Sequence, residues 1–443
     1  MTRRFLTTSV LAAAVLTSFV AARQRVVRAP APGPAVTVPT FNKEIVRIFQ
    51  RQCQSCHRPN DIAPFSLLTY RDARPRAGQI QEMVTSRQMP PWKATQGCGD
   101  FADARVLTDG EIDLINRWVD GGTPEGNPAD LPPPLEFGSG WTNGEPDLTL
   151  TMPEAFTPSG DGDIYRCFVL PTGITSDKYV SAIDVHPGDR ETVHHVIAFV
   201  DNTGESERLD AAEPGLGYTC FGGPIFTNPG TLGGWAPGAR PVTLPDGVAL
   251  PLRANARVVL QVHYHPHGAH VHPDQTAIGI YYAPRQPEKI MTILPLLNTT
   301  FTIPPNDPNY RVEASFPVPV PVHLYVIAPH MHLLGRKMRV ESTLPNGQTQ
   351  CLINIDDWDF RWQGLYRFRE PVAVPAGSRV SLTAFYDNST NNPNNPNDPP
   401  KPVSWGEQTT DEMCIAFLYV THDGEQLNAQ PVAPATATVT LED

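Results

Sequence analysis

Two histidines, His330 and His332, stand two residues apart in the apolar stretch APHMHLLGRKM, whose composition is typical of a β-strand. Side chains at positions i and i+2 of a strand point to the same face of the sheet. Both imidazoles would therefore open onto one common space, as ligands of a single metal ion do. For an isolated His-x-His, a pair of hydrogen-bonded or surface histidines is the alternative interpretation, so the remaining motifs must decide.

Further histidines and softer ligands cluster elsewhere in the chain. His194 and His195 are adjacent in TVHHVIAF, and Met413 precedes a cysteine in TTDEMCIAF. The stretch VLQVHYHPHGAHVH contains His263, His265, His267, His270 and His272. Imidazole suits copper, zinc, iron and nickel, whereas a thioether ligand selects copper, above all Cu(I). One cluster of three histidines and one of two histidines with a methionine predict two mononuclear copper sites of different softness.

A C-x-x-C-H motif, CQSCH, contains Cys53, Cys56 and His57. Cysteines at this spacing form two thioether bonds to haem, and the adjacent histidine ligates the iron. A redox-active cysteine pair and half of a zinc site are the alternatives, but no second C-x-x-C follows. Met89 in SRQMPPW is the expected second iron ligand, with an ordinary core methionine as its alternative. A His/Met haem c would carry single electrons at a relatively high potential.

The order of the copper-type motifs resembles the type II copper monooxygenases, the family of peptidylglycine hydroxylating and dopamine β-monooxygenases. The resemblance covers residues 145–425 and lies in HH, QVHYH, His-x-His followed by LLGRKM, and DEMC. It implies a first site that relays electrons and a second that binds oxygen and hydroxylates a C–H bond, both in jelly-roll sandwiches that face a solvent cleft. The first site would comprise His194, His195 and His263, and the second His330, His332 and Met413.

The resemblance also implies two disulfides, Cys167–Cys220 and Cys351–Cys414, which leaves Cys98 as a buried thiol or an intermolecular partner. Adjacent histidines cannot both face one side of a regular strand, so HH requires a β-bulge or the use of unlike ring nitrogens. Of the extra histidines, His265 is the one expected to support the first site from behind.

Two positions bear on the substrate. In the peptide-hydroxylating branch of the family, an arginine two residues before His-x-His and a tyrosine four residues after the methionine ligand hold a carboxylate. Here Ala328 and Phe417 stand at those positions, and neither pairs with an anion. The expected substrate is therefore a less polar molecule than a glycine-extended peptide.

The elements that would position these residues differ along the chain. FNKEIVRIFQRQC and LTDGEIDLINRWVDGG have helical periodicity, and the second opens with a capping box, Thr108 to Glu111. Beyond residue 140, short β-branched and aromatic runs predict β-sandwiches. The expected fold class is a small all-α cytochrome c domain followed by two all-β jelly-roll sandwich domains. The expected parts are a signal peptide 1–22, a Pro-rich spacer 23–40, the haem domain 41–124, a linker 125–140, and copper sandwiches 141–285 and 286–443.

Composition agrees with a β-rich, exported protein. The 48 prolines and 33 glycines suit many turns, because proline is excluded from helix interiors and central strands. The net charge of -12 argues against nucleic acid as a partner. The segment MTRRFLTTSVLAAAVLTSFVAARQ predicts a cleaved signal peptide and a bacterial periplasmic location, with a retained membrane anchor as the alternative. No later segment reaches transmembrane length, so we expect no integral membrane part after cleavage.

These expectations combine into a copper-dependent monooxygenase acting on a small organic substrate and O2. It would hold two copper ions and one covalent haem c, and its electrons would come through the haem from a redox partner protein, or from ascorbate or another external reductant. A non-catalytic haem–copper electron-transfer or copper-binding protein is the main alternative. A zinc or iron hydrolase using His330 and His332 would leave Met413 and the HH motif without a role.

Overall fold

The computed structural model describes residues 37–427, with gaps at positions 60, 62, 138–139, 161, 238 and 267–271. The expected signal peptide, nearly all of the expected spacer, and two of the extra histidines, His267 and His270, lie outside the described residues. From Pro39 onward the described residues belong to one compact unit. Within the described part, no helix combines the length and the apolar character needed to cross a lipid bilayer.

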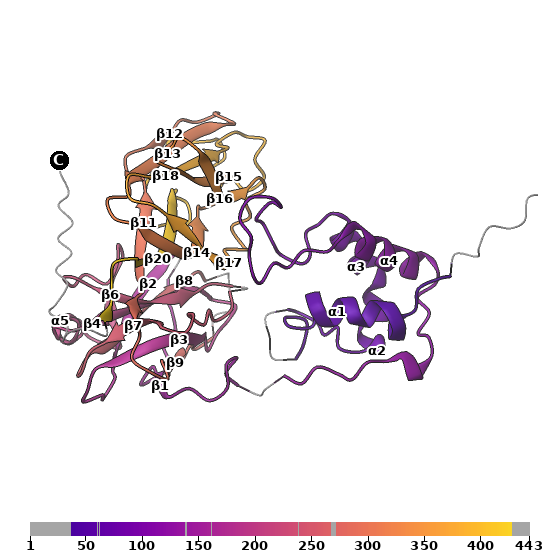
Figure 1. Ribbon diagram of the computed structural model, residues 1–443, viewed down its shortest axis with the longest axis horizontal. Helices are drawn as coiled ribbons and strands as arrows, with labels where there is room; N and C mark the ends of the chain where they lie inside the picture. Colours follow the sequence, from indigo (N-terminus) through magenta and orange to yellow (C-terminus); the bar gives the residue numbers. More distant parts are fainter. Residues whose placement is uncertain are drawn as a thin grey trace, which may run out of the picture. The chain divides into compact units, whose positions relative to one another are not determined.

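Short helices precede the β-rich part of the chain (Figure 1). The predicted capping box is present: the Thr108 N–H donates to Glu111 Oε2 at 2.8 Å, and the Glu111 N–H donates to Thr108 Oγ1 at 3.2 Å. Phe49, Ile115 and Trp118 are fully buried in a small apolar core between the helices. The helical elements are η1 Phe41–Ile45, α1 Val46–Gln52, α2 Tyr70–Ala73, η2 Arg74–Arg76, α3 Ala77–Thr85, α4 Asp109–Asp120 and η3 Pro128–Asp130.

The fold class expected from the sequence is wrong. The described chain is mostly β, and its first 90 or so described residues hold only four α-helices of 4 to 12 residues, not a substantial all-α cytochrome c domain. Prolines interrupt the helical periodicity, because a proline removes a helix hydrogen bond and clashes with the preceding turn. The segment 93–103 instead joins the sheets, with an isolated bridge between Ala94 and Ile355 and another between Phe101 and Phe368. The helices and sheets therefore share one compact unit.

Two five-stranded sheets enclose the first β-core. Their strand orders are β5-β2-β8-β4-β6 and β1-β9-β3-β7-β10. The β-branched residues Val196, Val258 and Ile280 are fully buried between them, as expected of strands that pack on one face. The elements are β1 Leu148–Thr151, β2 Ile164–Pro171, β3 Lys178–His186, β4 Val193–Asp201, α5 Glu205–Ala212, β5 Tyr218–Thr219, β6 Gly230–Trp235, β7 Val248–Leu252, β8 Arg257–Tyr264, β9 Ala277–Tyr282 and β10 Lys289–Ile290.

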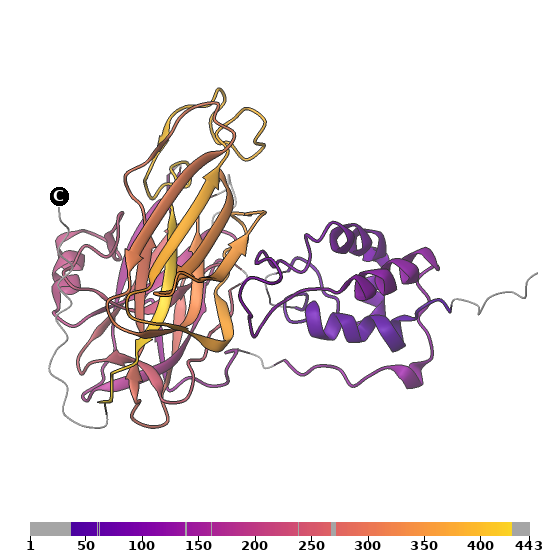
Figure 2. The same cartoon turned by 45° about the horizontal axis from the view of Figure 1, so that its top comes forward.

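Two four-stranded antiparallel sheets enclose the second β-core, and both are visible in Figure 2. Their orders are β11-β20-β14-β17 and β13-β18-β15-β16, and β12 pairs with β19 separately. Ile327, Leu382 and Tyr386 are fully buried in this core. The strands are β11 Thr292–Leu297, β12 Thr302–Ile303, β13 Tyr310–Pro317, β14 Val322–His330, β15 Gly335–Thr343, β16 Thr349–Ile355, β17 Tyr366–Val374, β18 Arg379–Tyr386, β19 Val403–Ser404 and β20 Ile415–His422.

Candidate metal centres

Three histidines converge where β4 and β8 pair. His195 lies opposite His263 in the ladder, and a β-bulge between Val193 and His195 leaves His194 as the extra residue. A bulge turns two neighbouring side chains toward one side of the sheet, as the adjacent histidines require. The Nδ1 atom of His195 lies 3.2 Å from Nδ1 of His194 and 3.3 Å from Nδ1 of His263. We call these residues the three-histidine cluster.

The imidazoles of the three-histidine cluster are neutral at neutral pH. Burial, reinforced by the neighbouring His263, lowers the pKa of His194 to about 2. Burial also holds the pKa of His195 well below its usual value, and it lowers the pKa of His263 although Asp163 opposes this. Neutral imidazole is the form that binds metal ions. The cluster can therefore receive a cation without first releasing protons.

His330 and His332 form the second group, at the carboxyl end of β14. Their ring centroids are 5.1 Å apart. His330 Nδ1 lies 2.6 Å from Gln363 Oε1, and His332 Nδ1 lies 3.1 Å from the carbonyl oxygen of Asp411. Because these acceptors fix the proton on Nδ1, the Nε2 lone pairs are left for a metal ion. Burial lowers the pKa of His330 to about 4 and that of His332 to about 3.

Met413 lies two residues before the start of β20 and is half-buried. The carboxylate of Glu412 accepts the N–H of His332 at 2.9 Å and the N–H of Met413 at 3.2 Å. The Tyr386 hydroxyl donates to the Met413 carbonyl at 2.8 Å. Burial raises the pKa of Glu412 to about 8. The backbone that carries Met413 is thus fixed beside the backbone of His332.

One aromatic ring contacts both groups of histidines. Phe360 stacks on His194 with 4.7 Å between ring centroids and 17° between the planes. The same ring meets His332 edge to face, at 5.7 Å and 80°. The Phe360 carbonyl accepts a hydrogen bond from Gln363 Nε2 at 2.9 Å, which ties it to the residue that supports His330. The segment between β16 and β17 therefore lies at the junction of the two groups.

Asp163 contacts the three-histidine cluster on the side of His263 that faces away from the other two histidines. Its Oδ1 lies 3.1 Å from Nε2 of His263 and also contacts Nδ1 of His265. Its Oδ2 accepts the Thr409 N–H at 2.6 Å. Burial alone would raise the pKa of the Asp163 carboxyl, but the contacts with His263, His265 and Thr409 together hold that pKa well below its usual value. His265 thus lies where support for the cluster was expected.

The sequence did not single out Asp163, Gln363 or Phe360. Asp163 stands alone before β2, and Gln363 and Phe360 lie in an irregular loop, so no spacing pattern marks them. Glu412 was visible only as part of DEMC. Two of the remaining described histidines lie beside aspartates elsewhere: His186 Nε2 is 3.3 Å from Asp184, and His323 Nδ1 is 2.5 Å from Asp423.

The C-x-x-C-H motif follows α1. Cys53 and Cys56 are free, half-buried thiols. His57 Nδ1 lies 3.1 Å from the Phe65 carbonyl oxygen, which leaves Nε2 available, and burial lowers the pKa of His57. Met89 is half-buried in the loop after α3, where its N–H donates to the Met83 carbonyl at 3.1 Å.

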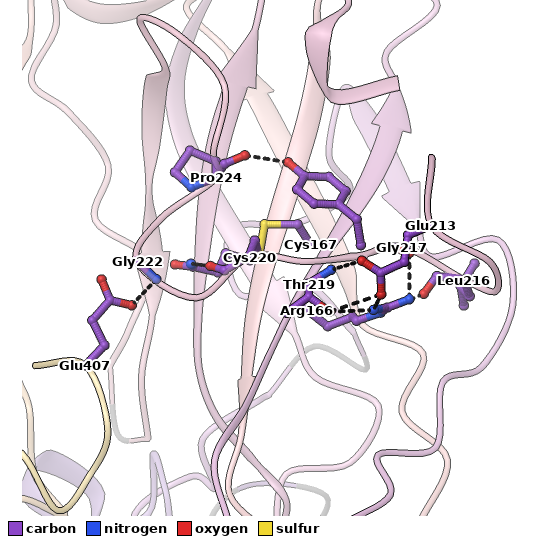
Figure 3. Close-up of a disulfide and its surroundings, with 12 residues drawn as sticks. Arg166, Cys167, Glu213, Leu216, Gly217, Thr219, Cys220, Gly222, Pro224 and Glu407 are labelled. Carbon is purple, nitrogen blue, oxygen red and sulfur yellow. Dashed lines mark hydrogen bonds and ion pairs between the residues drawn. A yellow bond between two sulfur atoms is a disulfide. The ribbon is translucent and has the colours of Figure 1, made fainter. Parts of the chain in front are cut away.

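Two disulfides are present. Cys167 pairs with Cys220, as expected, next to the ion pair between Arg166 and Glu213 (Figure 3). The expected Cys351–Cys414 pair is wrong, because Cys351 pairs with Cys98 and Cys414 is a free, buried thiol.

The reason for the Cys98–Cys351 pairing lies in the sheets. Cys351 is on β16, at the edge of its sheet, and Cys414 lies next to β20 in the facing sheet. The segment containing Cys98 runs beside β16, where the Thr95 N–H donates to the Asn354 carbonyl at 2.8 Å.

The donor atoms fit copper at both groups. The three-histidine cluster offers nitrogen atoms within 4.8 Å of one another, a set that suits copper or zinc. His330 and His332 offer two further nitrogen atoms, and the nearby chain carries the thioether of Met413. Sulfur from a thioether favours Cu(I) over zinc. The two groups thus differ in softness.

Parts of this chain are similar in sequence to known proteins. Residues 289–430, which contain His330, His332 and Met413, match the family model "Copper type II ascorbate-dependent monooxygenase, C-terminal domain". The chain is 23% identical over 296 residues to "DBH-like monooxygenase protein 1" of Gallus gallus, which covers 61% of this chain and 46% of the relative. It is 26% identical over 201 residues to "Peptidyl-glycine alpha-amidating monooxygenase A" of Xenopus laevis, covering 44% and 20%. These matches support the type II copper monooxygenase family.

The chain spans less than half the length of these curated relatives. Among solved structures, it is similar to the major capsid protein P2 of bacteriophage PM2, at 10% identity over 62% of this chain and 98% of that chain. The TM-score of 0.24 is too low for that similarity to inform fold or function.

Proposed function

We propose that this protein is an exported copper-dependent monooxygenase that hydroxylates a C–H bond of a small organic molecule. One observation carries the proposal: a three-histidine cluster and a His/His group with a nearby methionine both contact the ring of Phe360. Two metal sites of unlike softness, so placed, suit a reaction in which one site supplies an electron and the other handles oxygen. The family match adds independent support.

The balanced reaction is R–H + O2 + 2 electrons + 2 protons giving R–OH + H2O. Copper, once bound, would supply one-electron redox chemistry at both sites and oxygen activation at the second. His194, His195 and His263 would hold the first ion through Nδ1. His330 and His332 would hold the second through Nε2, together with the thioether of Met413. Phe360 would keep water out of the space between them.

Two positions beside the second histidine group lack a partner for a carboxylate. Ala328 on β14 lies directly opposite Phe417 on β20 in the ladder, so both positions that bind a carboxylate in the peptide-hydroxylating branch fall on one spot. Here that spot is apolar. We infer an aromatic or aliphatic substrate without a carboxylate at this point.

We further propose a haem bound through thioether bonds to Cys53 and Cys56, with His57 and Met89 as iron ligands. Two free thiols at the required spacing and the unengaged Nε2 of His57 support this. Arg105 Nη1 is buried without a hydrogen-bond partner in the described part of the chain. A haem carboxylate would satisfy this nitrogen, since a buried hydrogen-bond donor without a partner is costly.

The electron source and location complete the proposal. Electrons would reach the coppers from the haem, from a redox partner protein, or from ascorbate, the reductant named in the family model. A periplasmic location would allow the two disulfides to form and haem to be attached. In this proposal the haem segment would comprise residues 41–124, the linker 125–140, and the copper-binding parts 141–285 and 286–443.

The test combines metal binding with turnover. Metal-free protein titrated with copper should bind two ions, and with ascorbate it should consume O2 and hydroxylate members of a panel of aromatic and aliphatic compounds. His330→Ala should lose one copper and all product. His323→Ala, which removes a histidine paired with Asp423 away from both groups, should change neither. Copper binding without product over the whole panel would favour the electron-transfer alternative.

A further inference from the structure

One buried carboxylate, that of Asp163, contacts both a histidine of the first group and the segment of chain that supports the second. We propose that Asp163 is a positioning residue shared by the two copper centres: it orients His263 in the first centre and, through Thr409, anchors the segment 409–413 that builds the second. The inference rests on the proposed copper sites and adds a physical coupling between them. Nothing in the spacing of the histidines requires such a coupling.

On one side, the Asp163 carboxylate lies against the ring of His263, whose Nε2 makes no other hydrogen bond in the described part of the chain. The Asp163 side chain is 5% exposed and that of His263 is 2% exposed. Nδ1 of His263 faces the other two histidines of the cluster, while Nε2 lies 3.1 Å from Asp163 Oδ1. Tyr165 stacks on the same ring at 4.2 Å and 9°. A carboxylate behind a ligating histidine fixes its orientation and raises the basicity of the ligating nitrogen.

On the other side, Asp163 fixes the segment 409–413. Its Oδ2 accepts the Thr409 N–H at 2.6 Å. Two residues further along, the Asp411 carbonyl holds His332 Nδ1 at 3.1 Å, and the Glu412 carboxylate accepts the His332 N–H at 2.9 Å. Met413 follows directly. A short stretch of chain therefore connects Asp163 to one histidine and to the expected sulfur ligand of the second centre.

Two contacts of Glu407, just before this segment, also hold the chain to the first β-rich part. The Tyr165 hydroxyl donates to the Glu407 carbonyl at 2.5 Å, and Glu407 Oε2 accepts the Gly222 N–H at 2.7 Å. These contacts remain when Asp163 is changed. Loss of the carboxylate should therefore reorient His263 and residues 409–413 locally without detaching the segment.

The direct test is Asp163→Asn, which keeps the size of the side chain but removes its second acceptor oxygen and its charge. Copper affinity at the three-histidine cluster should fall about tenfold to a hundredfold, as for other residues that support a ligating histidine. Cu(I) affinity at the Met413 centre should also fall severalfold, and the infrared stretch of carbon monoxide bound there should shift, although no ligand of that centre has changed. In metal-free protein, exchange of the Thr409 amide hydrogen should accelerate.

Asp184→Asn is the matched control. Asp184 is also buried, lies 3.3 Å from a histidine nitrogen and accepts a backbone N–H, that of Thr142 at 2.7 Å, but it lies outside both histidine groups. This variant should leave both copper affinities and the carbon monoxide signal unchanged. His263→Ala then shows how much of the effect on the Met413 centre follows merely from an empty first site.

Several outcomes would overturn the inference. A Met413 centre with unchanged affinity and spectrum in Asp163→Asn, while the first centre weakens, would show that the two are not coupled through this residue. A third metal ion in the wild type that is lost in Asp163→Asn would make Asp163 a ligand instead. If Asp163→Asn does not fold, the His330→Ala variant provides the test. Binding of copper at the three-histidine cluster should then slow exchange of the Thr409 amide hydrogen. An exchange rate that does not change on copper binding would refute the coupling. Wild-type protein that binds no copper would refute the proposed function itself.

Discussion

Met413 is the residue that distinguishes the two proposed centres chemically. Replacing it with isoleucine removes the thioether while keeping an apolar side chain of similar volume. Met413→Ile should weaken Cu(I) binding at the second centre by at least tenfold and abolish hydroxylation, whereas the three-histidine cluster keeps its copper. Copper content and product yield, measured on the same preparation, check this.

Met338→Ile is the control for that substitution. Met338 lies on β15, is 1% exposed, and belongs to the second core rather than to a histidine group. This change should cost stability, about 1 kcal/mol, but leave both coppers and turnover in place. Full turnover in Met413→Ile would remove Met413 from the centre.

Phe360 supplies a second prediction at the scale of single residues. In Phe360→Ala, water would fill the space that the ring occupies between His194 and His332. Oxygen consumption should then continue with less product, so the ratio of product to O2 should fall severalfold while hydrogen peroxide appears. In Phe360→Leu, which keeps most of the apolar volume, the ratio of product to O2 should lie between those of the wild type and Phe360→Ala. An unchanged ratio in Phe360→Ala would show that the ring does not separate the centres from water.

For single residues, the sequence predicts a position well where the spacing of two residues determines the direction in which their side chains point. His-x-His on a strand predicts two side chains on one face; β14 ends at His330, so His332 lies just beyond it, yet the two rings lie together. Adjacent His194 and His195 required a bulge or unlike nitrogens, and the chain has the bulge. Asp163 could not be predicted, because its partners His263 and Thr409 are distant in the sequence and only the folded sheets bring them together.

Among the elements, the segment 93–103 is the one that the sequence misplaced. It carries no strong periodicity, and it pairs with strands more than 250 residues away in the sequence: the Ala102 N–H donates to the Arg367 carbonyl at 2.9 Å. Cysteine pairing cannot be derived from sequence order alone, so the partner of Cys351 depended on where this segment runs. The periodicity of the sequence correctly predicts the capping box of α4 and the strands β8 and β14.

The disulfide that anchors this segment gives an element-scale prediction. Cys98 and Cys351 are 253 residues apart, and closing so long a loop restricts the unfolded chain by up to about 5 kcal/mol in the chain-entropy model. Replacing both by alanine should lower the free energy of unfolding by a few kcal/mol without changing either copper affinity. Cys414→Ala, which removes a buried free thiol, should have a smaller effect. Equal unfolding temperatures with and without the Cys98–Cys351 bond would contradict the pairing.

At the scale of the whole molecule, the proposed function requires a route by which electrons reach the proposed copper sites. Each turnover requires two electrons beyond those of the C–H bond, and a His/Met haem would deliver them singly. Pre-reduced protein, mixed rapidly with O2 and substrate in the absence of free reductant, should show haem oxidation at the rate of product formation. Met89→Ala should change that rate by altering the haem potential. Haem that stays reduced while product accumulates would exclude this route.

The bulge in β4 inserts one extra residue, His194, into the three-histidine cluster. At this end of β4, His194 is the residue that has no paired residue on β8. Deleting it would restore a regular ladder while leaving His195 facing His263, because the register beyond the bulge is set by the rest of the strand. A single-codon deletion thus separates a three-ligand site from a two-ligand one. In evolutionary terms, gaining or losing the third ligand of the proposed first centre is one small step on an unchanged scaffold.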